Sequence, residues 1–191
     1  MQRLSGMDAA FLYAETPSVH MHTLKVAIVE PPKDLRTIDI MEGLRAELER
    51  RIHLLPPFRL RAVEVPLGLH HPVWVEDPEF NLSRHLYRVS LPKPGNETQL
   101  NAMVSRIASE ALPRDRPLWE IWLIDGLDSG DIAYVAKLHH ALADGTAASG
   151  LLENVMSVEP GSPVSEEPRP SKPAPMPSAT ELVSSALKEQ P

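Results

Sequence analysis

The chain has 191 residues, enough for one substantial hydrophobic core, and its 42% hydrophobic and 24% charged residues are ordinary for a globular protein. A formal charge of -7 argues against a nucleic-acid partner, because phosphate backbones are bound mainly by clustered Lys and Arg. Cysteine is absent, which excludes disulfides, cysteine-based metal sites and thiol catalysis.

The first third of the chain predicts a helix, a strand and a second helix. Ser5 followed by Asp8 has the form of a capping box, which would start a short helix running through Tyr13. Residues 21–30 are β-rich and predict a strand. The apolar residues that then recur at helical spacing are Met41, Leu44, Leu48 and Ile52.

The middle of the chain predicts strands followed by another capped helix. Residues 59–65 and 73–75 have the composition of short strands. Asn96 and Gln99 have the spacing of a capping box, and the apolar stripe of the helix after them implies a sheet beneath it.

Two strand-like runs, residues 118–124 and 132–138, are joined by a Gly- and Asp-rich segment that suits a hairpin connection. Across the chain, strands and helices mix without regular βαβ alternation. The pattern predicts an α/β protein of the α+β two-layer kind, with helices packed on a mixed, largely antiparallel sheet.

Seven of the twenty prolines lie between residues 160 and 177, in a stretch that cannot bury a core. We therefore expect a domain over residues 1–157 and a Pro-rich linker over 158–178. Residues 179–191 would start a further helix, which is amphipathic and has no following domain to pack on.

The segment HHALADG at residues 139–145 follows directly on the second strand of the hairpin. Period-2 alternation in a strand places the side chains of His139 and His140 on opposite faces, so one of them is expected to face substrate. An imidazole suits general-base work because its ordinary pKa of about 6.5 lets it accept a proton near neutral pH and return it later. Asp144 and Gly145 complete the pattern, and four specified positions would arise by chance in about one chain in a thousand of this length.

Each member of the segment also has a structural interpretation. A carboxylate at Asp144 could orient an imidazole, pair with an arginine, hold the turn or be the N-cap of a following helix. Gly145 permits backbone angles or a close approach that a side chain would forbid. A single histidine at a strand end is more often a hydrogen-bonded core residue than a base. The combination is what indicates a catalytic site.

Two other histidine pairs carry weaker signals. His70-His71 lacks the following Asp-Gly and is assigned to a loop or the start of a strand. His20 and His22 have a spacing that would suit a metal ion on a strand, but no third ligand is evident nearby, so no metal site is predicted.

These features resemble the bacterial wax ester synthase/acyl-CoA:diacylglycerol acyltransferase family, within the superfamily of CoA-dependent acyltransferases that shares the HHxxxDG motif. The likeness extends over most of residues 1–157. Its more specific elements are the opening LSGMDAAFL at residues 4–12, PVWVED at residues 72–77, and PLWE at residues 117–120. The resemblance implies one of two similar chloramphenicol acetyltransferase-like domains, joined by a crossover, with the C-terminal domain outside this chain.

The resemblance further implies that His140 deprotonates the hydroxyl of diacylglycerol or a long-chain alcohol, which then attacks acyl-CoA. Acyl-CoA is a co-substrate, and no resident cofactor is expected. His139, Asp144 and Gly145 would have structural or orienting roles. Pro117, Leu118 and Trp119 would line the substrate pocket or belong to the core, and the strand pattern of Trp119 favours the core.

Two alternatives stay open beside triacylglycerol or wax ester synthesis. One is a condensation-type acyltransferase that takes its acyl group from a carrier protein, and the other is a non-catalytic lipid-binding fragment. The chain lacks a signal peptide and a membrane-spanning apolar run, so we expect a cytoplasmic protein, with peripheral contact to membranes or lipid droplets left open.

Overall fold

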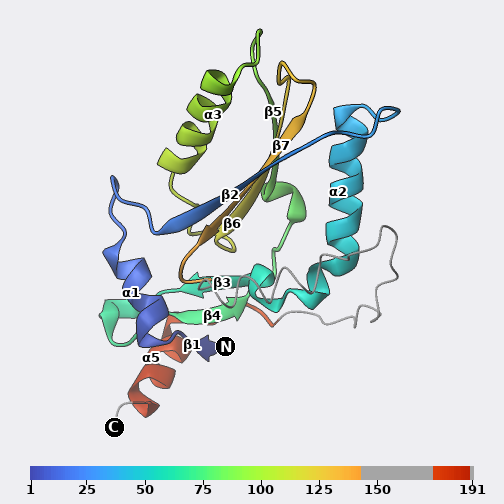
Figure 1. Cartoon of the computed structure of the whole chain (residues 1–191). Coiled ribbons are helices and arrows are strands. Elements are labelled where there is room, and N and C mark those ends of the chain that lie inside the picture. Colours follow the sequence, from blue (N-terminus) through green and yellow to red (C-terminus); the bar gives the residue numbers. More distant parts are fainter. Residues whose placement is uncertain (143–173, 190–191) are drawn as a thin grey trace.

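The computed structural model of the chain describes residues 1–142 and 174–189, which form two β-sheets with helices packed around them (Figure 1). The larger sheet has the order β2-β7-β6-β5, and the smaller one the order β1-β4-β3. The strands of the larger sheet are β2 (His22–Val29), β7 (Ile132–His139), β6 (Trp119–Asp125) and β5 (Leu86–Ser90). Those of the smaller sheet are β1 (Gln2–Arg3), β4 (Val73–Glu76) and β3 (Leu60–Val63).

The larger sheet is mixed, as the sequence predicts. β2, β7 and β6 pair antiparallel, whereas β5 and β6 pair in parallel and are connected through α3 (Glu97–Ser109). The strand β5 was not predicted from the sequence, and the structure has two sheets where one was expected. The other short elements are the 3-10 turns η1 (Ile52–Leu54), η2 (Pro56–Arg59), η3 (Pro66–Gly68) and η4 (Leu82–Arg84).

Both predicted helix caps are confirmed. The Ser5 hydroxyl accepts the backbone N–H of Asp8 at 3.1 Å and starts α1 (Gly6–Ala14). At α3, Asn96 and Gln99 form a reciprocal capping box, in which each side chain accepts the backbone N–H of the other residue. The predicted helix at Met41 is also confirmed as α2 (Thr37–Arg51).

β7 lies in the interior of the larger sheet, and its two faces contact two different hydrophobic clusters. Ala133 and Val135 face α3 and pack with Ile107 of that helix. Ile132 faces the other way and belongs to the cluster that contains Trp119 and residues of α1, α2 and the smaller sheet. The end of β7 is therefore held between two packed layers.

The C-terminal helix α5 (Ala179–Lys188) differs from expectation, because it packs on the smaller sheet of the preceding domain. Leu182 is buried against Val73 and Val75. Arg3 Nε donates to Glu189 Oε2 at 2.8 Å, and an Arg3 guanidinium nitrogen donates to the Ser185 hydroxyl at 3.2 Å.

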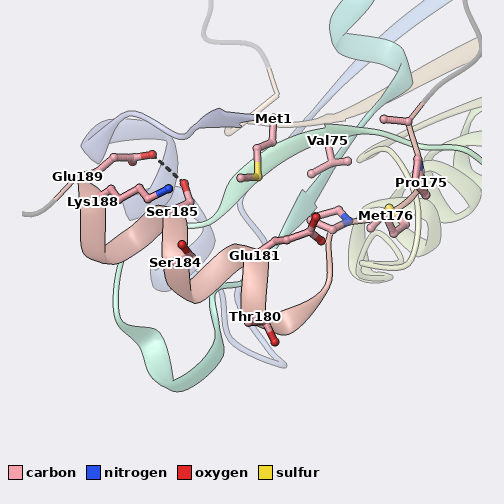
Figure 2. A pocket seen from close by; sticks show the side chains of 12 residues that line it. Met1, Val75, Pro175, Met176, Thr180, Glu181, Ser184, Ser185, Lys188 and Glu189 are labelled. Carbon is pink, nitrogen blue, oxygen red and sulfur yellow. Dashed lines mark hydrogen bonds between the residues drawn. The ribbon is translucent and has the colours of Figure 1, made fainter.

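An open groove of about 830 Å³ runs between α5 and the smaller sheet (Figure 2). Met1, Val75 and Met176 line its apolar part, and Glu181 and Lys188 lie on the helix side. Among the described residues that line it, none belongs to the part of HHALADG that the structure describes, residues 139–142. In the described ranges, no helix is long and apolar enough to cross a membrane.

Candidate active site

The HHALADG segment begins at the last residue of β7, where the sheet order places β2 on one side and β6 on the other. His139 is 0% exposed and lies on the α3 side with Val135 and Lys137, whereas His140 is partly exposed. The two imidazoles are therefore in different environments, on opposite faces of the strand.

His140 stands on the face of β7 that carries α1. Its imidazole stacks on the ring of Phe11, with centroids 5.0 Å apart and an interplanar angle of 22°. Within residues 1–142 and 174–189, neither ring nitrogen of His140 is hydrogen-bonded to protein. The stacking contact uses the face of the imidazole and leaves its two nitrogens available. Such a ring is arranged to exchange a proton with a bound ligand.

His139 is held in one tautomer by its surroundings. Its Nδ1 accepts the backbone N–H of Ala141 at 3.0 Å, so the proton of the neutral ring is on Nε2. That Nε2 faces Glu15 Oε1 at 3.6 Å, which is longer than a hydrogen bond. Burial, followed by the nearby Arg114 cation, lowers the pKa of His139 to about 4, so its ring is neutral near pH 7.

The backbone of the segment is fixed by successive hydrogen bonds. His139 N–H donates to the Leu118 carbonyl at 3.0 Å, and His140 N–H donates to the Met21 carbonyl at 2.8 Å. Leu142 N–H donates to the carbonyl of His139 at 3.0 Å. The position of His140 is thus set by two other stretches of chain, at Met21 and Leu118, and by a turn within the segment itself.

The three residues expected to line the substrate pocket or to belong to the core are buried beside this segment. Pro117, Leu118 and Trp119 are each among the least exposed residues, with Leu118 at 0% and Trp119 at 1%. The Trp119 indole N–H donates to the Phe58 carbonyl at 2.8 Å, and its ring stacks on His85 at 4.3 Å. None of the three is among the described residues that line the groove beside α5.

His20 and His22 contact the C-terminal end of α3. Their rings stack with centroids 5.4 Å apart, and each Nε2–H donates at 2.9 Å, His20 to the Ser109 carbonyl and His22 to the Ala108 carbonyl. Burial lowers the pKa of His22. In the described part of the chain, no group of three His, Asp or Glu side chains is placed to hold a metal ion.

Glu15 and Arg114 are site residues that the sequence analysis did not identify. The Glu15 carboxylate is only 10% exposed, pairs with Arg114, and lies 3.9 Å from His20 Nδ1. One signal was available: Phe11 and Glu15 are four residues apart, which places them on one face at the end of α1. Arg114 lies 99 residues from Glu15 in sequence, and no local pattern links them.

Asp144 and Gly145, the second half of the motif, lie outside the described residues.

The sequence profile of the wax ester synthase/diacylglycerol acyltransferase catalytic domain matches residues 4–191. The chain belongs to this family.

Among related proteins, two from Mycobacterium tuberculosis that are provisionally named diacylglycerol O-acyltransferases are each 42% identical to it. One matches over all 191 residues of this chain and the other over 187. This chain spans about 40% of the first relative's length and 39% of the second's.

Solved structures agree with this assignment. The wax ester synthase/diacylglycerol acyltransferase of Marinobacter aquaeolei VT8 superimposes with a TM-score of 0.67 and 32% identity, covering 78% of this chain and 37% of that one. The starter condensation domain of rhizomide synthetase gives a TM-score of 0.57 at 13% identity, over 81% of this chain and 37% of that one. The acyltransferase family thus shares this fold with condensation domains, and the predicted fold class is confirmed.

Proposed function

We propose that this chain is the N-terminal part of an O-acyltransferase that moves a fatty acyl group from acyl-CoA to diacylglycerol or a long-chain alcohol. Family membership supports acyl transfer. The observation that carries the assignment of the base is the contrast between two adjacent histidines. His139 is buried and neutral with its Nδ1 occupied, whereas His140 is partly exposed and stacked on Phe11.

His140 acts as the general base in this proposal. It takes the proton of the acceptor hydroxyl as the oxygen attacks the carbonyl carbon of the thioester. The tetrahedral intermediate then collapses, the carbon–sulfur bond breaks, and the imidazolium returns the proton to the CoA thiolate. The products are an ester and free CoA, and His140 is restored to its neutral form.

The relatives are about two and a half times as long as this chain, which covers 40% of their length. We therefore propose that a C-terminal domain completes the site and supplies the opposite wall around His140. The polypeptide in which that domain follows residue 191 is called the extended polypeptide below. Acyl-CoA, the acceptor alcohol and this domain are the proposed partners.

The substrate class is tested with the extended polypeptide and labelled palmitoyl groups. The donor is palmitoyl-CoA in one series and a palmitoyl carrier-protein thioester in the other, and the acceptors are diacylglycerol and hexadecanol. We expect labelled ester from palmitoyl-CoA with at least one acceptor. Ester formed only from the carrier-protein thioester would instead assign the chain to the condensation-type reaction.

The 191-residue chain is tested separately by calorimetric titration with CoA. Binding by this chain would indicate that the N-terminal part carries a preformed half-site for the donor. If the extended polypeptide binds palmitoyl-CoA and the acceptor but forms no ester, the chain is a lipid-binding protein and the proposal is wrong.

A further inference from the structure

We propose that Glu15 is a positioning residue that holds the backbone on both sides of His140. This inference rests on the proposed function of His140. Glu15 does not contact His140 or any reacting group. It acts through two different neighbours, the imidazole of His139 and the backbone of Met21.

The first connection runs through His139. The Nε2 of His139 faces Glu15 Oε1 at 3.6 Å, and its Nδ1 accepts the backbone N–H of Ala141 at 3.0 Å. Since Nδ1 is an acceptor, Nε2 carries the proton and directs it at the carboxylate. Glu15 therefore orients the ring that holds the residue following His140.

The second connection runs through Met21. The backbone N–H of Met21 donates to Glu15 Oε1 at 3.4 Å, and the Met21 carbonyl accepts the backbone N–H of His140 at 2.8 Å. One carboxylate oxygen thus organises the partners of two consecutive amide groups, those of His140 and Ala141. Both of these contacts lie at or beyond the long end of the hydrogen-bonding range.

The carboxylate is itself held in place. Glu15 follows directly on α1, and its other oxygen, Oε2, pairs with Arg114, whose side chain is 43% exposed. A buried carboxylate beside a neutral imidazole needs such a cation, because burial without a partner disfavours its charge. Phe11, one turn earlier on α1, stacks on His140. Helix α1 and the residue that follows it therefore lie against both histidines: Phe11 stacks on His140, and Glu15 faces His139.

The inference predicts a specific ranking of variants in the extended polypeptide. Glu15→Gln keeps an oxygen that accepts from Met21 N–H and faces His139 Nε2–H, whereas Glu15→Ala removes that oxygen. We expect Glu15→Ala to lower kcat by on the order of 10- to 100-fold, as small misplacements of a catalytic group do, with KM within about 2-fold. Glu15→Gln should recover most of that loss.

The matched control is Glu47→Ala on α2. Like Glu15, Glu47 forms ion pairs with arginine, in this case with Arg50 and Arg51. It lies outside the site. We expect kcat to be unchanged in this variant. Equal kcat for Glu15→Ala and Glu47→Ala, or an equal loss in Glu15→Gln and Glu15→Ala, would overturn the inference.

A second measurement does not depend on activity. Amide hydrogen exchange in the 191-residue chain should become faster at His140 and Ala141 in Glu15→Ala and stay near wild type in Glu15→Gln. Unchanged exchange at both amides in Glu15→Ala would also overturn the inference. If His140→Ala keeps full activity, the proposed function fails, whereas the exchange measurement still decides the role of Glu15.

Discussion

His139 and His140 are adjacent in sequence, yet their imidazoles lie on opposite faces of β7 and in opposite chemical settings. His139 is 0% exposed, and its Nδ1 is bonded to the N–H of Ala141. His140 is partly exposed and contacts the ring of Phe11. One histidine of the pair therefore has a structural role, and the other is accessible to a ligand.

The buried histidine predicts a loss of stability in acid. The folded-state pKa of His139 is lowered from 6.5 to about 4, so the unfolded chain takes up this proton first as the pH falls. The stability that the neutral ring contributes is complete above pH 6.5 and is lost between about pH 6.5 and pH 4, by on the order of 3 kcal/mol.

Urea unfolding of the 191-residue chain across this window measures the effect. His139→Asn should lower stability at pH 7 and reduce its fall towards pH 4. The fall should not vanish, because burial also lowers the pKa values of His22 and His85. A variant that keeps the full wild-type fall would show that His139 is not the main group responsible.

Trp119 is expected to act on stability through its buried hydrogen bond. Trp119→Phe removes the indole N–H that satisfies the Phe58 carbonyl, and it weakens packing on His85. We expect a loss of about 1–3 kcal/mol in the free energy of unfolding. Trp122→Phe is the control, because Trp122 is partly exposed and bonds the Glu120 side chain, so its loss should be clearly smaller. Equal losses would contradict the assignment of Trp119 to the core.

The docking of α5 on the smaller sheet is tested by two leucines of the same helix. Leu182 is 5% exposed and packs on Val73 and Val75, whereas Leu187 is 58% exposed. We expect Leu182→Ala to cost about 2–4 kcal/mol of packing and to speed amide exchange throughout α5, while Leu187→Ala leaves exchange nearly unchanged. Similar exchange in both variants would mean that α5 is not held by this contact.

Much of the fold follows from local sequence patterns. The alternation along residues 132–139 predicts which side of β7 each histidine occupies, and the Asn96–Gln99 spacing predicts the start of α3. These patterns are informative because one face of each element is buried and the other is not. The strand β5 was missed because its five residues include Arg88 and Ser90 and its parallel partner lies across α3.

The candidate site was predictable only in part. HHALADG is contiguous, so its spacing is visible in the sequence. Glu15, Met21 and Arg114 reach the motif only through tertiary contacts between segments far apart in the sequence, and Glu15 and Arg114 are themselves 99 residues apart. Only the Phe11–Glu15 spacing gave a local sign of them. The docking of α5 was likewise hidden, because its apolar stripe does not specify which surface it covers.

The central claim, that His140 is the general base, is tested most directly by acyl transfer from palmitoyl-CoA in the extended polypeptide carrying His140→Ala. The control is His70→Ala, which alters the other His-His pair in the loop before β4. We predict that His140→Ala lowers kcat by on the order of 10²- to 10⁴-fold, the usual contribution of a general base, and that His70→Ala leaves it unchanged. Activity of His140→Ala within a few-fold of the wild type would contradict the account.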